Sequence, residues 1–116
     1  MAEYKILHNP RCSKSRQTLT ILEEHNKNIE VFLYLEEDLS SEFIRNILSK
    51  LNLKARDILR KTEQDYKINN LSNPELSEDD LISMMTTYPK IIERPIVIRG
   101  SKGIIGRPPE NVLELF

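Results

Sequence analysis

Two short apolar stretches near the start of the chain flank a segment with helical periodicity. The alternating run at residues 4–8 predicts a strand, and the β-branched and aromatic run at residues 29–35 predicts another. Between them, apolar positions such as Leu19 and Leu22 predict a helix over residues 13–25. A strand, a helix and a strand within about 30 residues are typical of a right-handed parallel βαβ unit.

The middle of the chain, about residues 38–90, is predicted to be a helical insertion. Apolar residues recur at helical spacing over residues 39–51, and a shorter helix is expected over residues 54–61. The polar residues 64–76 predict a loop with some structure. A serine followed by three acidic residues then predicts a capped helix over residues 77–88.

The end of the chain returns to strands. Residues 96–98 and 103–105 predict two strands joined by a hairpin turn, and Pro109 suits the first turn of a last helix over residues 109–116. The order is therefore βαβ, a helical insertion, then ββα. This plan resembles a thioredoxin-like α/β domain with a mixed four-stranded sheet, so we expect a single domain over residues 1–116.

Composition narrows the class of protein. The chain has 116 residues, enough for one core, and 17 basic against 18 acidic residues give a net charge of -1. This balance argues against a nucleic-acid-binding protein. One cysteine cannot form an internal disulfide, and we find neither a signal-peptide pattern nor an apolar run of about 20 residues. We therefore expect a cytoplasmic protein without a membrane partner, and we expect it to be a monomer.

The single cysteine, Cys12, lies where a reactive thiol is expected. It follows the first predicted strand and a polar turn, and it opens the first predicted helix. The positive end of the helix dipole and the neighbouring cations Arg11, Lys14 and Arg16 favour a thiolate, which is the nucleophilic form. The alternative is a small buried cysteine with a structural role only.

Motifs around this cysteine and three distant arginines resemble one known family. The spacing His8-x-x-x-Cys12-x-x-x-Arg16 is similar to the signature of the glutaredoxin-dependent arsenate reductases (the ArsC family). The family places three anion-holding arginines in contexts that match Arg60 in Ile-Leu-Arg-Lys, Arg94 in Ile-Glu-Arg-Pro-Ile, and Arg107 in Ile-Gly-Arg-Pro-Pro-Glu.

The resemblance implies an enzyme that reduces arsenate to arsenite through one nucleophilic cysteine. Cys12 would attack arsenate held by the three arginines, whose forked guanidinium groups suit a tetrahedral oxyanion. Glutathione would be the co-substrate and glutaredoxin the protein partner, with no bound cofactor and no metal. The resemblance also implies a cis peptide bond before Pro95, next to the cysteine.

Three further residues near Cys12 are candidates from their position. His8 is expected to end the first strand and, as a cation, to favour the thiolate. The alternative is a histidine that only forms a hydrogen bond with the loop. Ser15 could donate a hydrogen bond to the thiolate. Arg16 could act through its charge or hold the loop in place.

Other functions remain open at this point. A glutathione-dependent thiol reductase of the same family could act on a different substrate. A transcription regulator of the Spx type has the same fold, but its redox-sensing members carry Cys-x-x-Cys, and Ser15 occupies the second cysteine position here. One cysteine with His8 and His25 does not make a closed zinc site.

Overall fold

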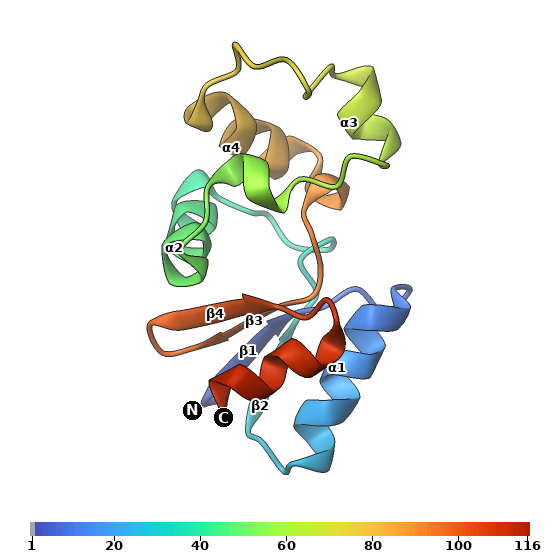
Figure 1. Ribbon diagram of the computed structural model, residues 1–116, viewed down its shortest axis with the longest axis vertical. Coiled ribbons are helices and arrows are strands. Elements are labelled where there is room, and N and C mark those ends of the chain that lie inside the picture. Colours follow the sequence, from blue (N-terminus) through green and yellow to red (C-terminus); the bar gives the residue numbers. More distant parts are fainter. Residues whose placement is uncertain (1) are drawn as a thin grey trace. The chain divides into compact units, whose positions relative to one another are not determined.

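The computed structural model describes residues 2–116, which form two compact units (Figure 1). The first unit extends to Glu37, resumes at Arg94 and continues to Phe116. The second unit is the continuous stretch Asp38–Glu93. It coincides closely with the helical insertion predicted at residues 38–90.

A four-stranded mixed sheet forms the centre of the first unit. Its strand order is β2-β1-β3-β4. The strands are β1 (Tyr4–Leu7), β2 (Ile29–Phe32), β3 (Ile96–Arg99) and β4 (Lys102–Ile105). β1 runs parallel to β2, whereas β3 is antiparallel to both β1 and β4. The predicted thioredoxin-like arrangement, a parallel βαβ half followed by a hairpin half, is confirmed.

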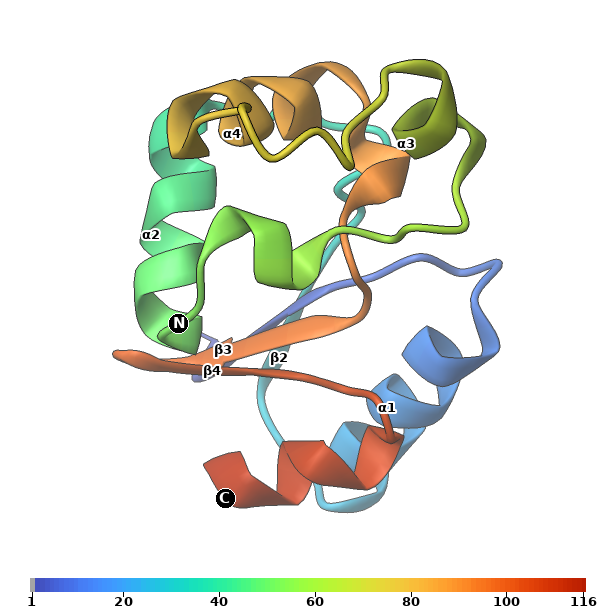
Figure 2. The same cartoon turned by 45° about the horizontal axis from the view of Figure 1, so that its top comes forward.

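Two helices cover one face of this sheet (Figure 2). They are α1 (Ser13–Glu24) and the 3-10 helix η3 (Pro109–Leu115). Their apolar side chains pack against the sheet in a core formed by Tyr4, Ile6, Leu22, Val97, Val112 and Leu115. This packing holds α1 against the sheet and so fixes where its first turn, with Cys12, lies beyond the end of β1.

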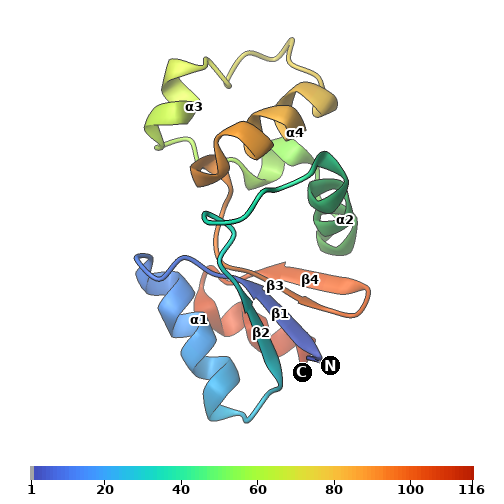
Figure 3. The ribbon, with the colours of Figure 1, turned by 180° about the vertical axis from the view of Figure 1, so that it is seen from behind.

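The second unit is helical (Figure 3). It contains α2 (Ser41–Leu51), the 3-10 helix η1 (Ala55–Ile58), α3 (Gln64–Ile68), α4 (Glu78–Thr87) and the 3-10 helix η2 (Pro89–Ile91). α4 contacts α2, η1 and η2, and Leu81, Ile82 and Met85 are its buried residues. Within residues 2–116, no helix is both long enough and apolar enough to cross a membrane.

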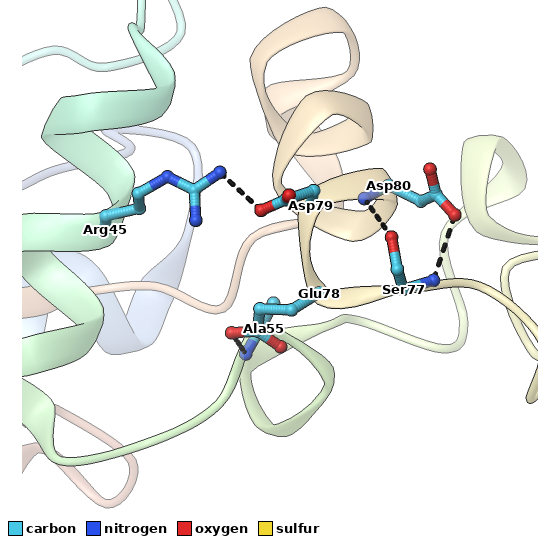
Figure 4. Close-up of polar contacts among 6 residues, drawn as sticks. All are labelled: Arg45, Ala55, Ser77, Glu78, Asp79 and Asp80. Carbon is cyan, nitrogen blue, oxygen red and sulfur yellow. Dashed lines mark hydrogen bonds and ion pairs between the residues drawn. The ribbon is translucent and has the colours of Figure 1, made fainter.

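The start of α4 is built from the capping residues that the sequence predicts (Figure 4). Ser77 Oγ accepts the backbone N–H of Asp80 at 3.1 Å, and Asp80 Oδ2 accepts the backbone N–H of Ser77 at 2.9 Å. Glu78 Oε2 accepts the backbone N–H of Ala55 at 2.9 Å and so ties η1 to α4. The acidic residues at this helix start therefore have structural partners.

The second strand is shorter than predicted. β2 ends at Phe32 rather than at residue 35, because the chain turns there: the Tyr34 N–H donates to the Phe32 carbonyl oxygen, and the Glu36 N–H donates to that of Leu33. The strand was predicted to be longer because Leu33 and Leu35 are apolar, but pairing with β1 stops at Phe32.

Two predicted helices are of a different type. The helices expected over residues 54–61 and 109–116 are 3-10 helices. Residues 64–76, predicted as a loop with some structure, contain the short helix α3. Arg60 was expected within a helix but follows η1. There its neighbour Leu59 forms a β-bridge with Ile92, and the Arg60 N–H donates to the Ile91 carbonyl oxygen at 2.7 Å.

Candidate active site

Cys12 is the N-cap residue of α1 and is partly exposed. A tight turn after β1 puts it there: Asn9 Oδ1 accepts the backbone N–H of Arg11, and the Asn9 carbonyl oxygen accepts that of Cys12, both at 3.0 Å. The Cys12 carbonyl oxygen then accepts the Arg16 N–H as the first bond of the helix. The thiol therefore lies beside backbone N–H groups that a helix start leaves without helical partners.

Arg107 brings a positive charge to the sulfur from the far end of the chain. Its Nη2 lies 3.4 Å from Cys12 Sγ. Its Nε donates to the carbonyl oxygen of Arg94 at 2.8 Å, which holds the guanidinium group in place. The Asn111 side chain donates to the Arg107 carbonyl oxygen at 3.0 Å. These contacts place Arg107 at the cysteine, and the Arg94 side chain also bonds the Cys12 thiol, so two of the three predicted arginines meet there.

Gly106 makes the close approach of this segment possible. A Cβ atom at Gly106 would lie 2.5 Å from Thr18 Oγ1 and 2.8 Å from Pro95 Cγ, both far inside normal contact. Thr18 is fully buried on α1. The Gly106 N–H donates to the Pro95 carbonyl oxygen at 2.9 Å. The segment carrying Arg107 can therefore lie directly against α1 only because residue 106 has no side chain.

The peptide bond between Arg94 and Pro95 is cis, the isomer expected there. The bond between Arg107 and Pro108 is also cis, although no sequence feature predicted it. Both prolines follow an arginine of the site.

The pKa of the Cys12 thiol lies below its ordinary value. Partial burial is the largest influence and acts to raise the pKa. The combined opposing effects are stronger: the backbone N–H of Ser15, the Arg94 side chain, the backbone N–H of Lys14 and the charge of Arg107 all lower it. The Cys12 side chain forms no capping hydrogen bond, so the backbone N–H groups of Ser15 and Lys14 contact the sulfur more weakly than a capping bond would. The site thus favours the thiolate.

His8 and Ser15 form a buried pair under the loop. His8 Nδ1 lies 2.6 Å from Ser15 Oγ, and Ser15 Oγ accepts the backbone N–H of Asn9 at 3.0 Å. Burial, followed by the charge of Arg16, lowers the pKa of His8. Neutral His8 can accept the single hydroxyl proton of Ser15 at Nδ1. This pair therefore stabilises the loop that carries Cys12.

Two sequence-based expectations change as a result. The lowered pKa of His8 disfavours the cation that was expected to support the thiolate, so the other interpretation, a histidine that bonds the loop, fits the geometry. The hydroxyl of Ser15 is directed to His8, and Ser15 acts on the sulfur through its backbone N–H instead.

Arg16 holds the loop in place, which was one of the two roles considered for it. Its Nη1 donates to the carbonyl oxygen of Pro10 at 2.8 Å. The charge that lowers the Cys12 pKa is that of Arg107, which is 95 residues from Cys12 in sequence.

Arg60 belongs to the second unit, where two carboxylates flank it. Its Nε lies 3.4 Å from Glu63 Oε1, and its Nη1 lies 4.0 Å from Glu93 Oε2. The Arg60 side chain is 18% exposed. A role for Arg60 in holding the anion stays a prediction.

Comparison with known proteins identifies the family. A model of the ArsC family matches residues 7–115. The chain belongs to the ArsC family. An arsenate reductase of Haemophilus influenzae is 45% identical over 114 residues, covering 96% of this chain and 97% of the relative. An uncharacterised protein of Escherichia coli K12, YfgD, is 48% identical over 114 residues, covering 97% and 96% of the two chains.

Solved structures of ArsC-type proteins have the same fold. The arsenate reductase from Vibrio cholerae superposes with a TM-score of 0.96 at 42% identity, covering 99% of this chain and 98% of that one. An ArsC-family-related protein from Bacteroides fragilis, at 22% identity and a TM-score of 0.85, shares the fold. The family resemblance read from the motifs is confirmed.

Some features of this ArsC-family site were missed at the sequence level. Thr18, Gly106 and Asn111 position the Arg107 segment, yet only the glycine carried a signal, as the residue beside a candidate arginine in a Gly-Arg-Pro sequence. Within residues 2–116, no group of three or more histidine, cysteine, aspartate or glutamate side chains could hold a metal ion.

Proposed function

We propose that the protein reduces arsenate to arsenite through Cys12, with glutathione and glutaredoxin as reductants. The observation that carries the proposal is the 3.4 Å contact between Arg107 Nη2 and Cys12 Sγ, which joins a guanidinium group to a nucleophile. Membership of the ArsC family and full-length similarity to arsenate reductases support arsenate as the oxyanion.

The first step uses the ionised thiol. Cys12 Sγ attacks the arsenic atom, a sulfur–arsenic bond forms, and one arsenate oxygen leaves as water after protonation. Arsenic remains pentavalent. Arg94 and Arg107 bind the oxygens and stabilise the charge that develops on them, because fixed cations in a partly buried site need little reorganisation. Arg60 is proposed as the third ligand of the anion.

The second step supplies the electrons. The glutathione thiolate attacks Cys12 Sγ, the sulfur–arsenic bond breaks, and its electron pair goes to arsenic, which leaves as trivalent arsenite. Cys12 is left in a mixed disulfide with glutathione. A glutaredoxin thiolate then removes the glutathionyl group and releases the Cys12 thiolate.

An external reductant follows from the cysteine count. The chain has one cysteine, so it cannot close an internal disulfide after arsenic is reduced. The choice of glutathione and glutaredoxin rests on the family resemblance. The proposed reaction suits a cytoplasmic protein, because glutathione is kept reduced in the cytoplasm, and it uses neither a bound cofactor nor a nucleic-acid or membrane partner.

A coupled assay tests the proposal. Arsenate turnover is followed by NADPH oxidation in the presence of glutathione, glutaredoxin and glutathione reductase. We expect Cys12→Ser to abolish turnover, and we expect Arg94→Gln and Arg107→Gln each to lower kcat/KM for arsenate at least about 100-fold, the scale seen for lost oxyanion donors. Lys102→Gln, which removes an exposed charge at the start of β4, is the matched control and should keep wild-type activity.

The same assay separates the alternatives. Turnover of a small glutathione mixed disulfide, with none of arsenate, would favour a thiol reductase and end the arsenate proposal. Appreciable arsenate turnover by Cys12→Ser would exclude the single-thiol mechanism. Specific capture of RNA polymerase subunits by an enzymatically inactive wild-type protein would favour an Spx-type regulator.

A further inference from the structure

A cluster of exposed cations adjoins Cys12 in the chain. Its members are Arg11, Lys14 and Arg16. No acidic residue occurs from His8 through Leu22, although the whole chain has a net charge of -1. The stretch around the nucleophile is therefore positive in a protein that is close to neutral.

Two of these cations lie where they oppose helix stability. Lys14 and Arg16 occupy the first turn of α1, where the positive end of the helix dipole disfavours cations. The first turn of α1 has no acidic residue, whereas that of α2 has Glu42 and that of α4 has three acidic residues. The cations at the start of α1 thus serve some purpose other than stabilising the helix.

Among residues 2–116, the Arg16 side chain has a structural partner, but the side chains of Arg11 and Lys14 do not. Arg16 Nη1 bonds the Pro10 carbonyl oxygen. In the part of the chain that the structure describes, residues 2–116, the side chains of Arg11 and Lys14 form no hydrogen bond and no ion pair. Their charges are therefore exposed in the segment of the chain that flanks Cys12.

The side-chain charges of Arg11 and Lys14 are also not among the influences that lower the pKa of Cys12. The pKa of Cys12 responds to the charge of Arg107, and Lys14 contributes through its backbone N–H rather than its ammonium group. Loop anchoring, helix stability and thiol ionisation are thus all explained without the side chains of Arg11 and Lys14.

We propose that Arg11 and Lys14, the basic rim of the site, bind the carboxylates of glutathione while its sulfur attacks Cys12. The inference rests on the proposed function, in which glutathione is the second thiol. Glutathione has two carboxylates and one ammonium group, so the rim favours it over a neutral thiol of equal reactivity. An attraction between exposed charges about 6–7 Å apart is worth a factor of about three in water.

Thiol–disulfide exchange tests the rim without arsenate. The Cys12 thiolate attacks one sulfur of oxidised glutathione, forms the mixed disulfide and releases one glutathione thiolate. The second-order rate constant is measured by mass spectrometry for oxidised glutathione, which is anionic, and for bis(2-hydroxyethyl) disulfide, which is neutral. The variants are Arg11→Gln, Lys14→Gln and their combination, with Lys102→Gln as the control for loss of an exposed cation elsewhere.

The rim predicts a loss that depends on reagent charge. Each single variant should react about threefold more slowly with oxidised glutathione, and the double variant about tenfold more slowly, with the neutral disulfide unaffected. Lys102→Gln should change neither rate. Added salt should slow the wild-type reaction with oxidised glutathione more than that of the double variant, since exposed charges are screened within about 10 Å at 0.1 M salt.

Two results would contradict the proposed role of the basic rim. Equal losses with both reagents would mean that the cations act on the thiolate, and an unchanged rate with oxidised glutathione would mean that they do not bind the tripeptide. The exchange assay contains no arsenate, so it tests glutathione binding by the rim even if the protein does not turn over arsenate. Failure of the rim proposal can therefore be distinguished from failure of the arsenate reductase proposal.

Discussion

Replacing Gly106 with alanine tests how closely the Arg107 segment must lie against α1. The added Cβ would meet Thr18 Oγ1 at 2.5 Å and Pro95 Cγ at 2.8 Å. Thr18 has little room to withdraw, because it is fully buried and its Oγ1 donates to the Lys14 carbonyl oxygen at 2.8 Å. Overpacking of this kind costs about 1–3 kcal/mol, and we expect urea unfolding to show a loss of that size.

The same substitution should slow the reaction of Cys12. Relief of the clash moves residue 106, and Arg107 follows it directly in the chain. The contact between Arg107 Nη2 and Cys12 Sγ is 3.4 Å, so even a small displacement weakens the attraction that favours the thiolate. We therefore expect slower alkylation by iodoacetamide at neutral pH.

Two further variants make the test specific. Gly100→Ala adds a methyl group where nothing lies within 4 Å, but at a φ of +60°, so it should cost about 1–2 kcal/mol through backbone strain and leave Cys12 reactivity unchanged. Thr18→Ala combined with Gly106→Ala removes the 2.5 Å contact, and the double variant should be more stable than the sum of the two single losses.

A Gly106→Ala protein with wild-type stability and a wild-type alkylation rate would show that the Arg107 segment does not need this close packing against α1. Strictly additive losses in the double variant would also contradict the expected clash, because the two side chains would then not compete for the same space.

Two further predictions concern the buried histidine and the helix cap. The pKa of His8 is lowered from 6.5 in the folded protein, so below about pH 6.5 the unfolded chain binds more protons than the native one. The free energy of unfolding should therefore fall as the pH falls. Urea titrations between pH 7.5 and 5 should show this loss, and a His8→Gln variant should lack it. In the second unit, Ser77→Ala should lower the free energy of unfolding by about 1 kcal/mol, because it removes the capping bond to Asp80. Asp79→Asn should lower it by less than about 1 kcal/mol, because the ion pair of Asp79 with Arg45 is exposed. Equal losses in the two variants would contradict this ranking.

Local sequence patterns were enough to predict the framework of the first unit. The alternation in residues 4–8 and the helical spacing after Cys12 are local properties, and β1 and α1 form nearly where they were predicted. The end of β2 could not be predicted in the same way. Leu33 and Leu35 are apolar, but strand pairing depends on a turn that tertiary structure selects.

The site was predictable in its residue types but not in its contacts. The motif identified Cys12, Arg94 and Arg107, yet their convergence spans 95 residues and depends on the close packing at Gly106. Ser15 was predicted as part of the site, but its hydroxyl pairs with the buried His8. That contact depends on the burial of both side chains, which is a property of the folded chain.

The pH dependence of Cys12 alkylation, measured with and without arsenate, tests whether this sulfur and the arginines form one site. A thiolate favoured by Arg94 and Arg107 predicts that alkylation proceeds below the pH at which an ordinary cysteine ionises, and that arsenate slows it in the wild-type protein much more than in Arg107→Gln. An ordinary cysteine titration with no effect of arsenate would contradict the claim that this sulfur and these arginines form one anion-binding site.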